Sequence, residues 1–245
     1  MTDAAAGRDA GMPDAAHSDA HQPGARRTGH PGVDVPDRRG RIGLDRVGLD
    51  LTGNPRVRVR DVRLLTSNWY VTRVTTFDFQ RGDGTWTTQE RETYDRGDGA
   101  CILLYDPETR SVLLTSQFRY PAYVNGHPTG DLIEVVGGLL DDDDAETAIR
   151  REAEEESGVR VGAVEHVFDV YMSPGSVTEK LHFYAAPYDA TRTAGGGLAD
   201  EGEDITVLEV PFDEALARIG DDIIDAKTIM LLQWAALRGP FAPSA

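Results

Sequence analysis

Three glutamates in one predicted helix, Glu152, Glu155 and Glu156, are the residues of this chain best placed to do chemistry. At about 100° per residue, Glu156 lies about 40° to one side of Glu152 and Glu155 about 60° to the other. The apolar Ala148 and Ile149 fall in the same sector. The opposite side carries Glu146, Arg150, Glu154 and Ser157. The three carboxylates therefore continue the face expected to point to the core. Buried carboxylates must be paired, protonated or bound to a cation, and such a group favours a hard divalent metal.

The spacing predicts this helix over residues 144–157, with Gly158 ending it in the usual capping role. The run Asp141 to Asp144 is interpreted as charge at the helix start, where the positive end of the dipole stabilises it. The alternative is an ordinary acidic surface helix, which would place the glutamates opposite Ile149.

The elements that must position the helix are mostly strands. Alternating polar and apolar residues predict a half-buried strand at Arg56–Arg60 and another at 69–80, joined through the turn 81–84 to residues 85–88. Further strands are expected at 100–105, 112–118, 132–136, 164–171 and 181–186, with helices at 212–219 and 226–237. This succession predicts an α+β sandwich in which helices cover a mixed sheet.

Composition narrows the class of partner. The chain has 245 residues, 40% of them hydrophobic, and a net charge of −17. Such an acidic protein should repel nucleic acid and anionic membrane surfaces, so metal ions would have to supply the positive field for a polyphosphate. The single cysteine, Cys101, is expected in the core and fits a reducing cytoplasm. With no apolar run of about 20 residues and no signal peptide, a cytoplasmic location is expected.

Residues 1–50 are expected to form a disordered tail, because their composition cannot bury enough apolar surface to offset the ordering entropy. His17, His21 and His30 lie in this tail at loose spacing, and they are interpreted as tail composition rather than a metal site.

The acidic helix carries a recognisable motif. The run Gly137-x5-Asp143-x7-Arg151-Glu152-Ala153-x-Glu155-Glu156-x-Gly158-Val159 resembles the Nudix box. Two positions depart from that box: Asp143 stands where the family has Glu, and Ala153 where it has a bulky aliphatic residue. The resemblance runs from about Leu64 to Leu237 and is strongest to the GDP-mannose hydrolase branch, which is close to the ADP-ribose pyrophosphatases. Other segments that carry it are 91–97, 117–119, 124–126, 171–175, 177–179, 195–205 and 225–228.

The resemblance implies a Nudix α/β/α sandwich over residues 98–240, preceded by an N-terminal antiparallel β-strand region at 51–97. It also implies a homodimer in which Trp69 or Arg91 is supplied to the partner's site. The implied reaction is Mg²⁺-dependent hydrolysis of GDP-mannose to GMP and mannose 1-phosphate, with Mn²⁺ as a substitute cation. Magnesium suits such a reaction because it neutralises phosphate oxygens.

The resemblance also assigns roles to residues. The implied metal ligands are the Gly137 carbonyl, Glu152, Glu156 and Glu203, and Glu155 and Glu203 are further catalytic candidates. The implied substrate-binding residues are Trp69, Arg91, Glu92, Arg119, Gly138, Leu139, Glu179 and Lys227. From the residues alone, Trp69 fits a sheet core equally well, and the arginines fit surface ion pairs. Arg151 is placed to orient a glutamate, and Glu90 departs from a family lysine.

Two other functions stay open. The first is hydrolysis of ADP-ribose or of a broader range of nucleotide-sugars. The second is a Nudix-fold sensor that binds a nucleotide-sugar without cleaving it. Such a sensor would be expected to lose box glutamates, which this chain keeps.

Overall fold

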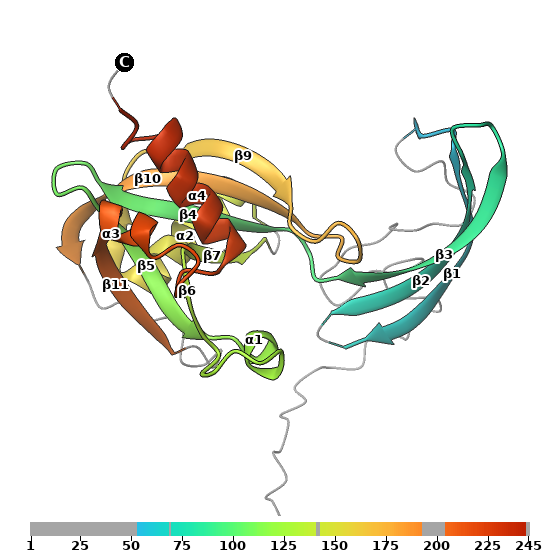
Figure 1. Cartoon of the computed structure of the whole chain (residues 1–245), viewed down its shortest axis with the longest axis horizontal. Helices are drawn as coiled ribbons and strands as arrows, with labels where there is room; N and C mark the ends of the chain where they lie inside the picture. Colours follow the sequence, from blue (N-terminus) through green and yellow to red (C-terminus); the bar gives the residue numbers. More distant parts are fainter. Residues whose placement is uncertain (1–52, 69, 141–142, 193–203, 244–245) are drawn as a thin grey trace, which may run out of the picture.

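A computed structural model describes residues 53–68, 70–140, 143–192 and 204–243, which form two β-sheets and four helices. The tail expected at residues 1–50 lies outside the described residues. The first sheet is an antiparallel meander of β1 (Val57–Ser67), β2 (Val71–Gln80) and β3 (Trp86–Asp95). It projects away from the rest of the molecule (Figure 1). The predicted antiparallel N-terminal region is thus confirmed, although β1 and β3 run further than the alternation indicated.

The second sheet is mixed. Its central strand β4 is antiparallel to β5 and β7 and parallel to β10. Strand β5 also pairs antiparallel with β11 and β6, and β10 pairs antiparallel with β8 and β9. The strands are β4 (Gly99–Asp106), β5 (Ser111–Phe118), β6 (Asp131–Glu134), β7 (Val136–Leu139), β8 (Val159–Val161), β9 (Glu165–Tyr171), β10 (Lys180–Arg192) and β11 (Ile205–Pro211).

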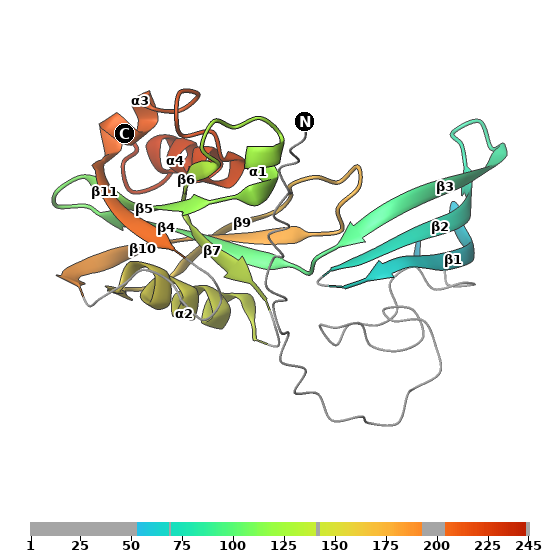
Figure 2. The same ribbon diagram turned by 90° about the horizontal axis from the view of Figure 1, so that it is seen from below.

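Helices cover both faces of this sheet, as Figure 2 shows from below. On one face α3 (Phe212–Ala217) and α4 (Ala226–Leu237) bury Phe212, Leu231 and other apolar residues against the sheet. On the other face α2 (Ala145–Ser157) buries Ile149 and Ala153. The short α1 (Tyr120–Val124) follows β5. The expected α+β sandwich with a mixed sheet is confirmed.

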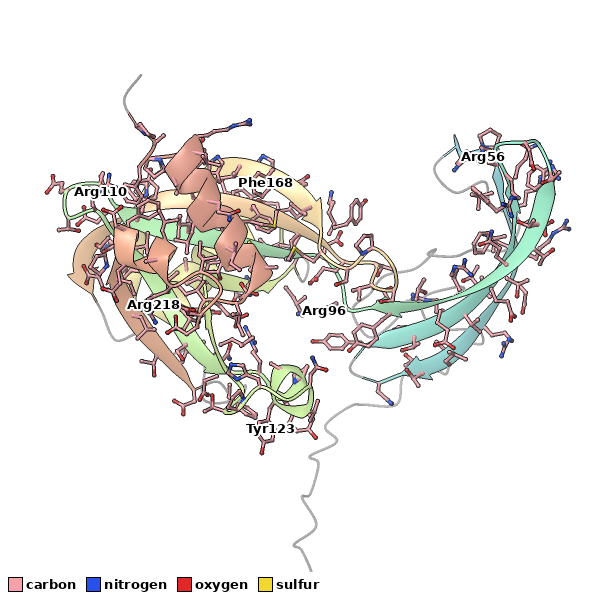
Figure 3. The ribbon with its side chains drawn as sticks, viewed as in Figure 1. Arg56, Arg96, Arg110, Tyr123, Phe168 and Arg218 are labelled. Carbon is pink, nitrogen blue, oxygen red and sulfur yellow. The ribbon has the colours of Figure 1, made fainter. Side chains whose placement is uncertain are left out.

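The two sheets meet where β3 passes into β4. The Tyr94 backbone N–H donates to the Ser176 carbonyl at 2.8 Å, and the Thr178 N–H donates to the Tyr94 carbonyl at 3.1 Å. Arg96 lies at this junction (Figure 3), with its Nε 3.4 Å from a carboxylate oxygen of Glu179. Within the described residues, no helix combines the length and apolar character needed to cross a membrane.

The strand predicted at 132–136 is two strands, because Val135 leaves the ladder between β6 and β7. Its N–H donates instead to the Thr228 hydroxyl on α4 at 2.7 Å. That hydroxyl donates in turn to the carboxylate of Asp225, the N-cap of α4, at 2.7 Å. Thr228 is fully buried. One side chain therefore fixes the start of α4 against the sheet.

Replacing Thr228 by Val should lower the free energy of unfolding by about 1–3 kcal/mol, because the buried Val135 N–H would lose its acceptor. Urea denaturation measures the change. Thr228→Ser keeps the hydroxyl and is the matched control, with a smaller loss expected. An unfolding midpoint for Thr228→Val equal to that of the unsubstituted protein would contradict this account of the junction.

Candidate active site

The acidic helix begins and ends as its sequence predicted. Asp144 is the N-cap of α2, and its side chain accepts hydrogen bonds from the Thr147 N–H at 3.1 Å and the Thr147 hydroxyl at 2.7 Å. Gly158 takes a left-handed conformation with φ 69°, and its N–H donates to the Glu154 carbonyl at 3.0 Å. Glycine adopts this conformation at no steric cost. Both helix boundaries are therefore set by local chemistry.

The start of α2 is coupled to a box glutamate through Arg151. One guanidinium nitrogen of Arg151 pairs with Asp143, and another lies 3.5 Å from a carboxylate oxygen of Glu152. The contact with Glu152 is the one expected if Arg151 orients a glutamate, as the helical angle indicated. Asp143, the relaxed motif position, therefore holds one end of this chain of charges.

Glu152 lies directly against the backbone of β7. A Cβ added to Gly138 would lie 2.5 Å from the Cδ and 2.8 Å from a carboxylate oxygen of Glu152. No real Cβ approaches so closely, so a glycine is needed here for the carboxylate to occupy this position. Gly138 pairs with Ala100 of β4, and Leu139 pairs with Gly99. The predicted residues Gly137, Gly138, Leu139 and Glu152 are thus brought together.

Glu156 lies one turn further along the same helix face and is 7% exposed. Glu155 is exposed, so the expectation that it faces inward is wrong, and so is the outward placement of Ser157, which is 2% exposed. The reason is the position of the buried face. With Ala153 and Ser157 buried, that face is centred about 50° from Glu152, which leaves Glu155 about 110° away from its centre.

A second group of charges lies on the α4 side of the sheet. Lys227 places its Nζ 2.5 Å from one carboxylate oxygen of Glu134, and Arg119 places its Nε 2.6 Å from the other. The Lys227 Nζ also lies 3.0 Å from Asp225. Burial would lower the pKa of Lys227, but the carboxylates of Glu134 and Asp225 outweigh burial and raise it. Lys227 therefore stays a cation at neutral pH.

Glu134 is a residue that the motif comparison missed. It ends β6, is 4% exposed and holds two of the cations expected to bind substrate. A signal was present in the sequence, since a glutamate inside the apolar run Leu132 to Val136 must be buried and therefore paired.

Glu179 lies between these two groups. One carboxylate oxygen lies 3.7 Å from the position that a Cβ on Gly99 would take, and the residue is 8% exposed. Burial raises the pKa of its carboxyl, and the charges of Arg96 and Lys227 partly oppose the rise. Buried Cys101 lies next to Gly137, and burial raises the pKa of its thiol, so Cys101 is a core residue as expected.

Two predicted site residues are not brought to this group, and two others lie outside the described residues. Arg91 and Glu92 are exposed on β3, in the sheet that projects away from β7 (Figure 2). The Arg91 guanidinium donates to the Glu90 carbonyl at 2.7 Å and to the Gln89 side chain at 2.9 Å. Trp69 and Glu203 lie outside the described residues.

The arrangement suits a divalent cation next to an anion. Glu152 and Glu156 present carboxylate oxygens, the donors that hard cations prefer, and the Glu152 carboxylate lies against the backbone of Gly138. Arg119, directly after β5, and Lys227, in the first turn of α4, supply cations, and guanidinium groups match phosphate oxygens well. The residues present therefore fit a divalent metal.

Comparison with known proteins agrees with this geometry. A NUDIX domain model matches residues 95–232, so the chain belongs to the Nudix family. Residues 56–94 match a second model, that of the GDP-mannose pyrophosphatase NudK N-terminal domain. Members of the Nudix family generally use a divalent metal.

The matches with individual relatives span nearly the whole length of each relative. A GDP-mannose pyrophosphatase of Pectobacterium atrosepticum is 52% identical over 187 residues, which are 76% of this chain and 97% of the relative. One from Cronobacter sakazakii is 51% identical over 72% of this chain and 93% of its own. Among solved structures, an ADP compounds hydrolase has a TM-score of 0.58 at 17% identity, covering 76% of this chain and 97% of its own. That likeness concerns the fold alone.

The contact between Gly138 and Glu152 gives a direct test of the site. Gly138→Ala should reduce turnover roughly a hundredfold, because the added Cβ would displace the carboxylate by about 1 Å. The fold should persist, since the displaced group is the end of a flexible side chain. Steady-state kinetics and circular dichroism measure the two effects. Gly82→Ala is the matched control, because its Cβ would meet nothing within 4 Å. Unchanged turnover in Gly138→Ala would refute the assigned position of Glu152.

Proposed function

We propose that this protein hydrolyses the diphosphate bond of GDP-mannose, releasing GMP and mannose 1-phosphate, with Mg²⁺ as its cofactor and Mn²⁺ as a substitute. The observation that carries the proposal is the 52% identity to a GDP-mannose pyrophosphatase over 97% of that relative's length. The retained box carboxylates support it, since Glu152 and Glu156 lie together on one helix face. Residues 98–240 are proposed as the catalytic domain, and residues 51–97 as the region for dimerisation and substrate contact.

In the proposed reaction, the oxygen of a water molecule forms a bond to one phosphorus and the bond from that phosphorus to the bridging oxygen breaks. Glu152, Glu156, Glu203 and the Gly137 carbonyl are the proposed metal ligands. The bound metal would neutralise the diphosphate oxygens. Glu203 is also a candidate to position the water and accept its proton, and exposed Glu155 would flank the metal ligands.

The cations on the α4 side would bind the substrate. Arg119 and Lys227 are proposed to contact phosphate oxygens or sugar hydroxyls, and Glu134 holds both side chains in place beforehand. Such positioning before binding reduces the entropy lost when substrate arrives. Buried Glu179, Gly138 and Leu139 would line the same region. Trp69 is proposed to stack on the nucleobase.

A homodimer is proposed because Arg91 and Glu92 are distant from the box within one chain. They lie on β3 of the projecting sheet, whereas Gly138 and Glu152 lie on β7 and α2 of the α+β sandwich (Figure 1). A second copy could place its projecting sheet over this site, so that each site takes residues from both chains.

Glu156→Gln should lower turnover of GDP-mannose by at least about a hundredfold, because it removes the charge of a buried metal ligand. The fold should persist, since the amide has the same shape. Glu154→Gln is the matched control, because Glu154 is exposed on the same helix. Released phosphate products, compared across GDP-mannose, ADP-ribose and UDP-glucose with Mg²⁺, measure both activity and selectivity.

Different results test the metal site and the choice of substrate. Full activity in Glu156→Gln would refute the metal site. Much faster turnover of ADP-ribose would refute GDP-mannose as the substrate, while binding without hydrolysis of any of the three compounds would favour a sensor.

Mixing two inactive variants tests the shared site. Arg91→Ala and Glu156→Gln should each be inactive as homodimers. Equal mixing with subunit exchange should restore roughly a quarter of the unsubstituted activity, because half of the dimers then contain one intact site. Kinetics on the mixed sample measures the recovery. A mixture as inactive as its components would show that Arg91 serves its own chain.

A further inference from the structure

A cluster of two histidines and one aspartate lies on β9 and β10, apart from the residues discussed above. His166 places its Nε2 2.7 Å from the Oδ1 of Asp169, and His182 places its Nδ1 2.8 Å from the same oxygen. In the described part of the chain, this is the only group of at least three His, Cys, Asp or Glu residues that can each offer one ligand atom within 4.8 Å of the others.

A β-bulge brings the three side chains to one face of the sheet. Residues 166 and 169 are three apart, so a regular strand would point them to opposite faces. The register of β9 on β10 shifts between Phe183 and Tyr184, which leaves Val167 as the extra residue. Phe168 then packs on the α4 side, while Asp169 lies opposite His182 on the α2 side. Bulges re-aim side chains in this way and are common beside functional sites.

The cluster is open to solvent at the edge of the sheet. The side chains of His166 and Asp169 are 52% and 39% exposed, and that of His182 is 18% exposed. Among the described strands, β9 pairs with β10 alone. The ring of Tyr184 packs edge-on against His166, with the ring centroids 5.4 Å apart, and supports one wall of the cluster. An ion could therefore enter without disturbing the core.

We propose that His166, Asp169 and His182 form a binding site for a divalent transition metal of the Zn²⁺ class. Imidazole nitrogen with carboxylate oxygen is a donor set that suits zinc, whereas Mg²⁺ takes oxygen donors. Tetrahedral zinc with bonds of about 2.0–2.1 Å separates its ligands by roughly 3.3 Å, so each imidazole nitrogen needs to part from the Asp169 oxygen by about half an ångström. Three protein ligands leave the fourth position to water.

The neighbourhood of the cluster limits its affinity and keeps it distinct from the Glu152 site. The Nζ of Lys180 lies 3.7 Å from the other oxygen of Asp169, so it occupies the carboxylate oxygen that the histidines do not share. His182 pairs with Ala100, and Ala100 pairs with Gly138. Two strand spacings, roughly 10 Å across the sheet, therefore separate His182 from Gly138, and Asp169 lies one strand further away, so each site could hold its own ion.

Isothermal titration of the full-length protein with Zn²⁺, in excess Mg²⁺ to occupy the oxygen ligands of the Glu152 site, tests the proposal. The unsubstituted protein should bind about one equivalent of Zn²⁺. His182→Ala and the more exposed His166→Ala should each weaken binding by at least about tenfold. Circular dichroism verifies that both variants fold. Co²⁺ in place of Zn²⁺ should give visible absorption bands typical of low coordination that both variants lose.

The N-terminal histidines provide the matched control. The triple variant His17→Ala, His21→Ala, His30→Ala removes the other group of histidines that could bind Zn²⁺, and it should bind like the unsubstituted protein. Loss of Zn²⁺ binding in the triple variant would overturn the proposal. So would unchanged binding in both His166→Ala and His182→Ala, or displacement of Zn²⁺ by Mg²⁺.

Discussion

The candidate active site depends on one close approach, that of the Glu152 carboxylate to the backbone of Gly138. A Cβ on Gly138 would lie 2.5 Å from the Cδ of Glu152, so no side chain fits between this carboxylate and the strand. The approach is held from both directions. Ile149 and Ala153 pack α2 onto the sheet, and the Arg151–Asp143 pair ties Glu152 to the start of its helix. The contacts that pack α2 onto the sheet therefore also set the position of Glu152.

Charge balance provides the second organising element. The chain is acidic overall, yet the cations that the site needs are kept in place by a buried carboxylate, Glu134, rather than left free on the surface. A buried glutamate with two cationic partners is far less costly than an unpaired one.

The sequence predicted those parts of the molecule that local chemistry determines. Asp144 and Gly158 mark the ends of α2 through capping, and the angle of Glu156 on its helix follows from the helical repeat. Glu155 was assigned to the wrong face because the buried stripe was centred on Ala148 and Ile149 without the contribution of Ala153 and Ser157. The break at Val135 and the pairing of Glu134 with Lys227 could not be predicted, since both depend on α4, about 90 residues further along the chain. Nor does residue spacing reveal the bulge at Val167, which only strand register creates.

The two sheets differ in how far apart their paired strands lie along the chain, and this difference affects the order of folding. In β1, β2 and β3 each strand pairs with its neighbour in sequence, so this meander can form as soon as residue 95 has left the ribosome. The central strand β4, in contrast, needs β10 as its parallel neighbour, and the entropy of closing that long loop must be overcome first. During synthesis the projecting sheet would therefore be complete while the unit that it adjoins was still unfolded.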